Sequence, residues 1–525
     1  RALIVRPEAG SLRYYSPMRW SWLVVLAACG GAHPATFDAS PDVPGDEGGP
    51  DTGCPAADMT CGGTCVDTNT DRAHCGDCTT ACDPGLSCAA GSCVLPHATT
   101  SVLHYGGPDF GNFVEAIAVD GAGNFYLAGA FVGTIDLGAG PIVANGPQDW
   151  LVASVTPAGA LRWARGFGGA QLDQAAGITV DSHGHVFVIG NFQSTVDFGG
   201  GTLTSAGSDD IAIVTLAQDT GAYVAARRLG TADSEDGLGI VVDATGNQTI
   251  CGFFGAGTLD LGGGHSLTGA ASDNAFVASF DSSGAHRWSR LLGAGTTGNL
   301  SSCQAIALDA AGGVVTAGSF HGTVDFGAGP VTGSSDIFVA AYTATGTPRW
   351  SHHYGGSSYD EAYTIAVAGN GDVMVGGQLY GQADLGTGTI GASGTSDGFL
   401  LQLDDAGAAR FARVLGGGGL VRAVRSDPAG LLVATGSLIG VTDLGTGSLA
   451  PIGPSDVFVA GFGVDGNARY ARRLGGSDYA EGDSLAISTG GALAIGGFFR
   501  GTADLGTGAI AGGARDNGFV MLLAP

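Results

Sequence analysis

The stretch AIAVDGAGNFYLAGAF, from Ala116 to Phe131, decides the fold because close copies of it recur along the chain. It joins two apolar runs through a turn that contains glycine together with aspartate or asparagine, which is the pattern of a β-hairpin. Further copies begin at Gly177, Gly239, Ala305, Thr364, Ala423 and Ser484. Hairpins that recur at a spacing of about 61 residues indicate a repeat protein.

A second signature, GTIDLG from Gly133, follows every hairpin, and its aspartate is present in all copies. Aspartate side chains accept backbone N–H groups in tight turns, so we expect a structural role for this set. Calcium binding is the alternative, since oxygen ligands suit a hard cation, although no EF-hand-like loop surrounds these residues. The set consists of Asp136, Asp197, Asp260, Asp325, Asp384, Asp443 and Asp504.

Two more signatures complete each repeat. An aspartate precedes an apolar strand, as Asp336 does, and a strand rich in arginine and aromatic residues follows, as in LRWARGFGG from Leu161. Four strands in a repeat of this length predict a β-propeller blade, with the arginines of the fourth strand on a solvated rim. The other strand-leading aspartates are expected at Asp149, Asp209, Asp273, Asp397, Asp456 and Asp516.

The two ends of the repeat array predict how the ring closes. The last repeat stops after its third strand, whereas Thr99–Gly107 precedes the first repeat and matches an isolated fourth strand. Pairing of these two segments would leave no radial gap. We therefore expect an all-β fold, a seven-bladed β-propeller of four-stranded blades over residues 99–525, closed by its N-terminal strand and preceded by a small disulfide-rich module.

The repeat motifs also carry a family resemblance. The combination of AVDxxGNxYxxG, a TxDFG-like turn, SDxFVAxxxxxG and RWxxxxGG resembles the bacterial β-propeller repeat family called SBBP. The resemblance covers Thr99 to Pro525 and is weakest in the sixth repeat. It implies a propeller on an exported or cell-surface protein, and it supplies no catalytic residues.

The N-terminal region has the features of an export signal. Arg19 precedes a short apolar run, and Leu26-Ala27-Ala28-Cys29 resembles a bacterial lipobox, whose cysteine becomes the lipidated first residue of the mature protein. We predict a leader over residues 1–28, in which 1–17 are an over-long start assignment or a genuine extension, and lipidation of Cys29. A plain signal peptide with a chance cysteine is the alternative. Residues 29–53, acidic and without arginine or lysine, predict a flexible tether.

Residues 54–98 are rich in cysteine. A dense, even set of cysteines in an exported chain predicts disulfides, whereas a zinc site would rest on the single C-x-x-C of Cys75 and Cys78. The set consists of Cys54, Cys61, Cys65, Cys75, Cys78, Cys82, Cys88 and Cys93. Two later cysteines, Cys251 and Cys303, either bridge adjacent blades or remain separate buried thiols.

The composition excludes several classes of protein. The chain has 525 residues, of which 96 are glycine, and each glycine inside a helix costs about 1 kcal/mol, so long helices are not expected. All 21 basic residues are arginine, which excludes a Schiff-base lysine and a P-loop lysine. A net charge of −27 disfavours binding to nucleic acid. No motif predicts catalytic residues, a metal site or a cofactor.

The loops that join one blade to the next differ in every copy, and such loops carry recognition on a rigid scaffold. They lie on the same face as the GTIDLG-type turns and contain acidic and aromatic side chains, with Glu115 and Glu481 among them. Such a face suits a basic protein patch, a cation or a sugar ring, and solubility alone is the alternative reason for it. The candidate binding residues are Asp109, Phe110, Asp173, Asp236, Tyr359, Asp360, Glu361, Asp478, Tyr479 and Asp483.

Two functional hypotheses follow from these features. The favoured one is a lipid-anchored protein of the bacterial cell envelope, exposed at the surface or secreted, whose monomeric propeller binds an envelope or extracellular protein or a glycan without catalysis. The membrane would be contacted only through the N-terminal lipid. The alternative is an exported enzyme that acts on polysaccharide through paired carboxylates of the loops between blades.

Overall fold

The computed structural model describes residues 58–68, 74–81, 87–89, 92–94, 97–106, 111–293, 298–391, 396–428, 430–463 and 465–525. All regular secondary structure in these ranges is β-strand. None of the described residues belongs to a helix long and apolar enough to cross a membrane. The predicted leader, the predicted lipidation residue Cys29 and the predicted tether lie outside the described residues.

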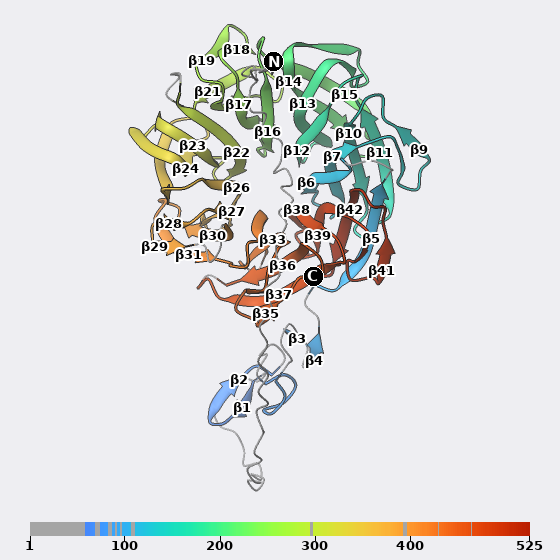
Figure 1. Ribbon diagram of the computed structural model, residues 1–525, viewed down its shortest axis with the longest axis vertical. Helices are drawn as coiled ribbons and strands as arrows, with labels where there is room; N and C mark the ends of the chain where they lie inside the picture. The colour runs from blue at the N-terminus through green and yellow to red at the C-terminus, as the bar shows by residue number, and fades with distance from the viewer. Residues whose placement is uncertain are drawn as a thin grey trace, which may run out of the picture.

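Seven antiparallel sheets of four core strands stand around a central axis as the blades of a propeller, which confirms the predicted fold (Figure 1). Blade 1 consists of β6 (Phe113–Val119), β7 (Phe125–Phe131), β10 (Asp149–Val155) and β11 (Leu161–Phe167), and blade 2 of β12 (Gln174–Val180), β13 (His185–Asp197), β14 (Thr202–Ala217) and β15 (Tyr223–Leu229). Blade 3 consists of β16 (Glu235–Val242), β17 (Gln248–Phe254), β20 (Asn274–Phe280) and β21 (His286–Leu291), and blade 4 of β22 (Leu300–Leu308), β23 (Val314–Asp325), β24 (Pro330–Tyr342) and β25 (Pro348–Gly356). Blade 5 consists of β26 (Asp360–Val367), β27 (Val373–Leu379), β30 (Asp397–Leu403) and β31 (Ala409–Val414), and blade 6 of β32 (Leu420–Ser426), β33 (Leu432–Leu438), β36 (Asp456–Phe462) and β37 (Ala468–Gly476). Blade 7 consists of β38 (Ala480–Ile487), β39 (Leu493–Phe499), β42 (Asn517–Leu523) and, as its outer strand, β5 (Thr99–Gly106).

The ring closes as predicted, because the N-terminal strand β5 pairs antiparallel with the C-terminal strand β42 from Thr99↔Leu523 to Gly106↔Asn517. The backbone N–H of Ala524 also donates to the carbonyl of Ala98 at 2.8 Å. Both ends of the propeller therefore belong to one sheet, and separation of the blades requires that sheet to be broken.

The core consists of seven hydrophobic clusters, and each of them joins two adjacent blades. The cluster between the last blade and the first, for example, packs Val520 and Leu522 against Val114, Leu127 and Leu151. The third strands are buried along their whole length in blades 1, 3, 5, 6 and 7, which explains the apolar runs that mark them in the sequence. Stability thus arises between blades as much as within them.

A short hairpin lies between the second and third strands of each blade. Five of these hairpins are separate strand pairs, and in blades 2 and 4 they continue β13–β14 and β23–β24. In all seven the predicted turn aspartate accepts the N–H of the glycine two residues later, at 2.7–2.8 Å. The separate pairs are β8 (Thr134–Asp136) with β9 (Pro141–Val143), β18 (Gly257–Gly262) with β19 (His265–Gly269), β28 (Gln382–Asp384) with β29 (Thr389–Gly391), β34 (Thr442–Asp443) with β35 (Ser448–Leu449), and β40 (Thr502–Asp504) with β41 (Ala509–Ala511).

The predicted strand-leading aspartates begin or directly precede the third strand in five blades: Asp149, Asp397 and Asp456 are first residues, and Asp273 and Asp516 come one residue before β20 and β42. In blades 2 and 4 the third strand is longer, and Asp209 and Asp336 lie within it. Asp149, Asp336, Asp397 and Asp456 pair with Phe131, Phe320, Leu379 and Leu438 of the second strands. In the other three blades the equivalent place in the pairing belongs to the next residue. The residues in register there are Asp210, Asn274 and Asn517.

The arginines of the outer strands do more than solvate the rim. Arg165 of blade 1 donates to the carbonyl of Gly221 in blade 2 at 3.2 Å, and Arg227 of blade 2 donates to Gly284 of blade 3 at 2.9 Å. The same contact recurs between blades 3 and 4 and between blades 5 and 6. At the closure Arg472 donates to the carbonyl of His97. These arginines therefore connect neighbouring blades, which the prediction of a solvated rim did not include.

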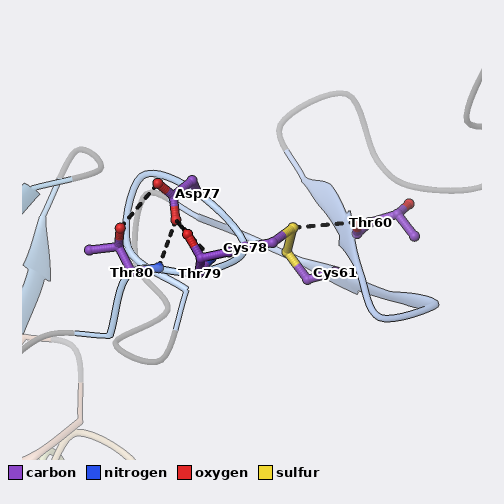
Figure 2. Close-up of a disulfide and its surroundings, with 6 residues drawn as sticks. All are labelled: Thr60, Cys61, Asp77, Cys78, Thr79 and Thr80. Atoms are coloured by element: carbon purple, nitrogen blue, oxygen red, sulfur yellow. Dashed lines mark hydrogen bonds between the residues drawn. A yellow bond between two sulfur atoms is a disulfide. The ribbon is translucent and has the colours of Figure 1, made fainter. Parts of the chain in front are cut away.

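The described part of the cysteine-rich module contains the strand pairs β1 (Met59–Cys61) with β2 (Thr64–Val66), and β3 (Ser87–Ala89) with β4 (Ser92–Val94). Cys61 and Cys78 form a disulfide with an S–S distance of 2.07 Å, close to a turn in which Asp77 accepts the N–H groups of Thr79 and Thr80 (Figure 2).

The remaining cysteines after Cys29 divide into four pairs. Cys65 and Cys75 are also disulfide-bonded, and Cys88 and Cys93 occupy paired positions of β3 and β4. Cys251 and Cys303 are free, buried thiols, so of the two predicted states the unbridged one is present. Cys54 and Cys82 lie outside the described residues.

Candidate functional site

The innermost strand of every blade carries a β-bulge at the same place, and the first strands of adjacent blades lie side by side around the axis (Figure 1). A bulge adds one residue to a strand and re-aims a side chain, and bulges are common beside binding sites. Because the other three strands of each blade lie outward of the first, the bulged residues lie nearest the axis of the ring, and we call this axial region the channel. They are Glu115, Ala176, Leu238, Gln304, Tyr363, Arg422 and Asp483.

A glycine in the second strand makes room for each bulge. A Cβ atom on Gly497 would lie 2.0 Å from the carbonyl oxygen of Glu481, the residue two before the bulged Asp483. All seven blades have this close approach, at 1.9–2.2 Å. Only glycine allows the two backbones to come so near, so the glycines fix where the bulges form. The other six are Gly129, Gly190, Gly252, Gly318, Gly377 and Gly436.

Arg422 is the centre of a charged cluster in this channel. Its Nε atom lies 2.6 Å from Oε1 of Glu481 and 3.9 Å from Oδ1 of Asp483. Its guanidinium carbon lies 4.7 Å from the centroid of the Tyr363 ring, which is within the range of a cation–π contact. The side chains of Arg422, Glu481 and Asp483 are 14%, 16% and 12% exposed, so the cluster is shielded from bulk water without being sealed.

Carboxyl groups crowd around this arginine. Burial raises the pKa of Glu115, although the Arg422 charge opposes the shift, and the Nε2 atom of Gln174 lies 3.4 Å from Oε1 of Glu115. Burial also raises the pKa of Asp483 well above its usual range, and the carboxylates of Glu481 and Glu115 raise it further. The protein therefore holds several carboxyl groups close together at a cost in free energy.

The cluster continues into blade 5 through Glu361 and Tyr363. Burial raises the pKa of Glu361, against hydrogen bonds from Tyr363 and Tyr359 that lower it. The hydroxyl of Tyr363 donates to Oε1 of Gln378 at 3.3 Å. In blade 3, by contrast, Asp236 accepts a hydrogen bond from the side-chain amide of Asn191. Five carboxyl groups thus belong to the channel, together with the guanidinium of Arg422 and that of Arg425 on the same inner strand, which donates to the carbonyl of Val424 at 2.8 Å. The charged groups are concentrated on the side of blades 5, 6, 7 and 1.

Two residues of the predicted binding face are interior residues, which corrects the prediction for them. Asp173 and Asp360 are both 0% exposed. Asp360 accepts the N–H groups of Gly356 and Tyr380 at 3.0 Å, and Asp173 accepts those of Gly169 and Gln193 at 2.7 and 2.9 Å. Each carboxyl group thus joins its own blade to the preceding one. Burial raises the pKa of each to about 6.

The other predicted residues fall into two places. Asp236, Glu361 and Asp483 belong to the channel. Tyr479 is 43% exposed in the loop between blades 6 and 7, beside Asp478, and the guanidinium of Arg500 lies 5.3 Å from its ring centroid. Tyr359 lies 5.9 Å from Tyr380, between ring centroids, in the loop between blades 4 and 5. Asp109 and Phe110 lie outside the described residues.

Within the described ranges, no group of three or more His, Cys, Asp or Glu side chains is placed to hold a metal ion.

Sequence reasoning missed Arg422 and the bulges. Most arginines belong to outer strands, and Arg422 stands in an inner strand, where it interrupts the apolar alternation of the sixth repeat. The bulges had a signal as well, because a glycine recurs inside every second strand, and glycine within a strand is a mark of a bulge or a close backbone approach. Both signals were visible as departures from an otherwise regular pattern.

Comparison with known proteins gives different matches for the cysteine-rich segment and for the propeller. The model of the stigma-specific STIG1-like protein family matches residues 46–96, which is the cysteine-rich segment. No curated protein matches the sequence.

Three solved propellers illustrate the likeness of the ring. The chain is similar to the WD40 β-propeller domain of Doa1 at 10% identity, covering 82% of this chain and 97% of that one with a TM-score of 0.38. It is similar to the Neurospora crassa Pan2 WD40 domain at 11% identity, with 82% and 98% coverage and a TM-score of 0.41. It is similar to BamB from Moraxella catarrhalis at 11% identity, covering 78% of this chain and 85% of that one with a TM-score of 0.34. At such TM-scores these likenesses say nothing about function, and the assignment of a seven-bladed propeller rests on the strand order of this chain.

Proposed function

We propose that the propeller is a non-catalytic binding scaffold, and that it receives a cationic group from a basic patch of an envelope or extracellular protein in its central channel. The observation that carries this proposal is the imbalance of charge among the channel side chains. Glu115, Asp236, Glu361, Glu481 and Asp483 contribute five carboxyl groups, against the guanidinium groups of Arg422, which pairs with Glu481, and Arg425, which donates to a backbone carbonyl. A further cation would favour the ionised forms that burial now disfavours.

The same proposal includes the location of the protein. The segment Leu26-Ala27-Ala28-Cys29 and the acidic residues that follow it support a protein held in the bacterial cell envelope by a lipid on Cys29. The resemblance of the repeats to the SBBP family supports an exported propeller. Mass spectrometry of the mature N-terminus tests the anchor: a diacylated or triacylated Cys29 is expected, and an unmodified Cys29 or cleavage elsewhere contradicts it.

Binding in the channel is tested with fluorescent octa-arginine and octa-glutamate peptides and the full chain, by anisotropy at two salt concentrations. We expect the basic peptide alone to bind, and the double variant Glu115→Gln, Asp483→Asn to weaken binding about tenfold. The matched control is Asp219→Asn, Asp465→Asn, which removes the same charge from turns on the opposite face of the ring. Equal losses in both double variants would mean that net charge, and not the channel, attracts the peptide.

A second candidate function, hydrolysis of an exported polysaccharide, is favoured by one observation. Glu481 is paired with Arg422, whereas the neighbouring Asp483 and Glu115 have raised pKa values. Neighbouring carboxyl groups in different electrostatic environments are the arrangement from which a general acid and a general base are built. Release of reducing sugar from bacterial and plant glycans, measured for the wild type and for Glu481→Gln and Asp483→Asn, distinguishes the functions. Turnover that both substitutions abolish would establish the enzyme and overturn the non-catalytic scaffold.

A further inference from the structure

A groove lies far from the channel, along the outer edge of blade 1, with a volume of about 460 Å³. Its floor is the edge strand β11, from Leu161 to Arg165. One wall is the β8–β9 hairpin, with Leu137, Pro141 and Ile142, and the other wall is the turn of blade 2 that contains Asp219 and Thr220. The groove therefore follows a strand edge and has a wall on each side of it.

Comparison of the repeats explains why this groove is open in blade 1. A Cβ atom on the first glycine of the hairpin turn would lie 3.0 Å from Tyr223 in blade 2, 2.6 Å from Pro348 in blade 4 and 3.1 Å from Ala409 in blade 5. The turns of blades 6 and 7 pack in the same way on Ala468 and Thr99, and in blade 3 His265 stacks on His286 with ring centroids 4.0 Å apart.

Blade 1 lacks this contact. A Cβ atom on Gly138 or Gly140 would meet nothing within 4 Å, although Leu161 occupies the place in register with Tyr223 and Pro348. Strand β9 of this hairpin lies at the rim (Figure 1), and the hairpin contacts the end of β11 through Ile142, whose Cγ2 atom would lie 2.7 Å from a Cβ atom on Gly166. The space that every other blade fills with its own side chains is thus left open here.

The outer edges of these blades accept an additional strand elsewhere in the same molecule. The hairpin strand β28 of blade 5 pairs antiparallel with β25 of blade 4, and β40 of blade 7 pairs with β37 of blade 6. Of the strands in the described residues, only β10 pairs with β11. The guanidinium of Arg165 donates to the carbonyl of Ala164 at 2.8 Å, so this carbonyl points away from β10 and toward the groove. Alternation then places the N–H and C=O groups of Arg162, Ala164 and Gly166 on the open edge.

The charge of the groove is opposite to that of the chain. Arg165 donates to the carbonyls of Ala164, Thr220 and Gly221, and no described carboxylate forms an ion pair with it. Arg162 pairs with Asp219 at 3.2 Å, but the Asp219 side chain is 92% exposed, and such pairs contribute little. A groove with two guanidinium groups and one solvated carboxylate, in a chain of net charge −27, complements an anionic occupant.

From these observations we propose that the groove of blade 1 binds an extended acidic peptide segment of another protein as a fifth strand on β11. Main-chain hydrogen bonds to Arg162, Ala164 and Gly166 would hold the peptide, and a carboxylate side chain of the peptide would face Arg165. Apolar side chains of the peptide would pack on Pro141 and Ile142 of the hairpin. This site is independent of the channel and of its preference for a cation.

The test uses a displayed library of random ten-residue peptides selected on the full chain. The variant Ala139→Trp fills the groove from an exposed turn position, and Thr387→Trp places the same side chain at the equivalent turn of blade 5, which packs on Ala409. We expect selected peptides to alternate β-branched residues with Asp or Glu, to bind Ala139→Trp about tenfold more weakly than wild type, and to bind Thr387→Trp like wild type.

Synthetic versions of the selected peptides test whether an acidic side chain and main-chain hydrogen bonds are both needed for binding. Replacement of their acidic residue by lysine, or of a central residue by proline, is expected to weaken binding, since each removes one of the two proposed modes of recognition. Selection of no peptide, equal binding to wild type and Ala139→Trp, or a preference for lysine over glutamate would overturn the proposal. Binding of anionic oligosaccharides such as oligogalacturonate in the absence of any peptide binding would also overturn it.

Discussion

The Nε atom of Arg422 lies 2.6 Å from Oε1 of Glu481, and this contact joins blade 6 to blade 7 inside the central channel. Both residues belong to innermost strands, and Arg422 is the bulged residue of its strand. The bulge exists because Gly436, in the neighbouring strand, has no Cβ atom to block the carbonyl of Leu420. A repeated glycine thus places the Arg422 guanidinium among carboxyl groups from several blades.

Substitution of Arg422 by methionine should destabilise the propeller by about 3 kcal/mol at pH 7, because it leaves shielded carboxylates without their cation. Urea unfolding followed by tryptophan fluorescence measures the loss. The deficit should shrink as the pH falls, because burial raises the pKa values of Glu115 and Asp483 and protonation removes the charge that Arg422 offsets. The double variant Arg422→Met, Glu481→Gln is the control and should recover part of the stability. A single variant as stable as the wild type would mean that the pair adds nothing.

The contribution of Asp173 and Asp360 to stability should increase on acidification from pH 7 to pH 5, whereas His97, His104, His286 and His352, whose pKa values burial lowers, contribute in the opposite direction. The pKa values of Asp173 and Asp360 are about 6 in the folded protein, raised by burial from 3.8, so between these values the folded state binds more protons than the unfolded state. Their contribution to the free energy of unfolding therefore rises as the pH falls through this window. Aspartates with lowered pKa values, such as Asp281 beside Ser283, lose their contribution only at lower pH.

Urea unfolding at intervals between pH 7 and pH 5 measures this dependence. The double variant Asp173→Asn, Asp360→Asn keeps an acceptor oxygen at both sites and should flatten the slope. Stability that decreases steadily over the same range in the wild type is the opposite outcome, and it would show that other titrating groups dominate.

Replacement of Gly497 by alanine should cost about 3 kcal/mol, because its Cβ atom would lie 2.0 Å from the carbonyl oxygen of Glu481 and force the two strands apart. Gly121→Ala is the matched control, since a Cβ atom there meets nothing within 4 Å. Thermal unfolding of the two variants gives the comparison. If both lower Tm by the same amount, the close approach is not what makes glycine necessary in the second strand.

Removal of the strand Thr99–Gly106 should lower Tm by more than about 10 °C or prevent folding, because β42 would lose its partner and the ring would open. Deletion of residues 1–96 provides the control, as it removes the cysteine-rich module and leaves β5 and His97 in place. Calorimetry of the two truncated chains distinguishes the roles. Equal Tm values would contradict closure by the N-terminal strand.

The architecture was predictable because every blade has the same four core strands in the same order. The hairpin of Ala116–Phe131 and the turn aspartates recur in every repeat, and the isolated strand at Thr99 supplies the strand that the last repeat lacks. An assignment made in one repeat therefore applies to the others. Register within a copy was harder. Asp209-Asp210 and Asp273-Asn274 are each two adjacent polar residues. Only the pairing between the strands shows which residue of each pair lies opposite Phe192 or Phe254.

The site was predictable only in part, because its residues depart from the repeat. Glu361 and Asp483 were predicted as acidic residues of the loops between blades, and they lie instead within the inner strands β26 and β38, where they belong to the channel. Asp173 and Asp360 have the same chemistry in the sequence, yet they lie one residue before the channel-facing position and bind backbone groups instead. A shift of one residue moves a side chain to the other face of a strand, and sequence alone does not locate such a shift.

One measurement tests the channel proposal most directly, and the absence of lysine from this chain makes it possible. A carbodiimide joins carboxyl groups to amines without a spacer, so any amide between a lysine and a carboxyl group of the protein comes from an added oligolysine peptide. Peptide mapping by mass spectrometry then locates the contact. We predict amides on Glu115, Glu361, Glu481 or Asp483, and their loss when free arginine competes. Amides confined to exposed acids such as Asp219, with the channel carboxyl groups unmodified, would contradict it.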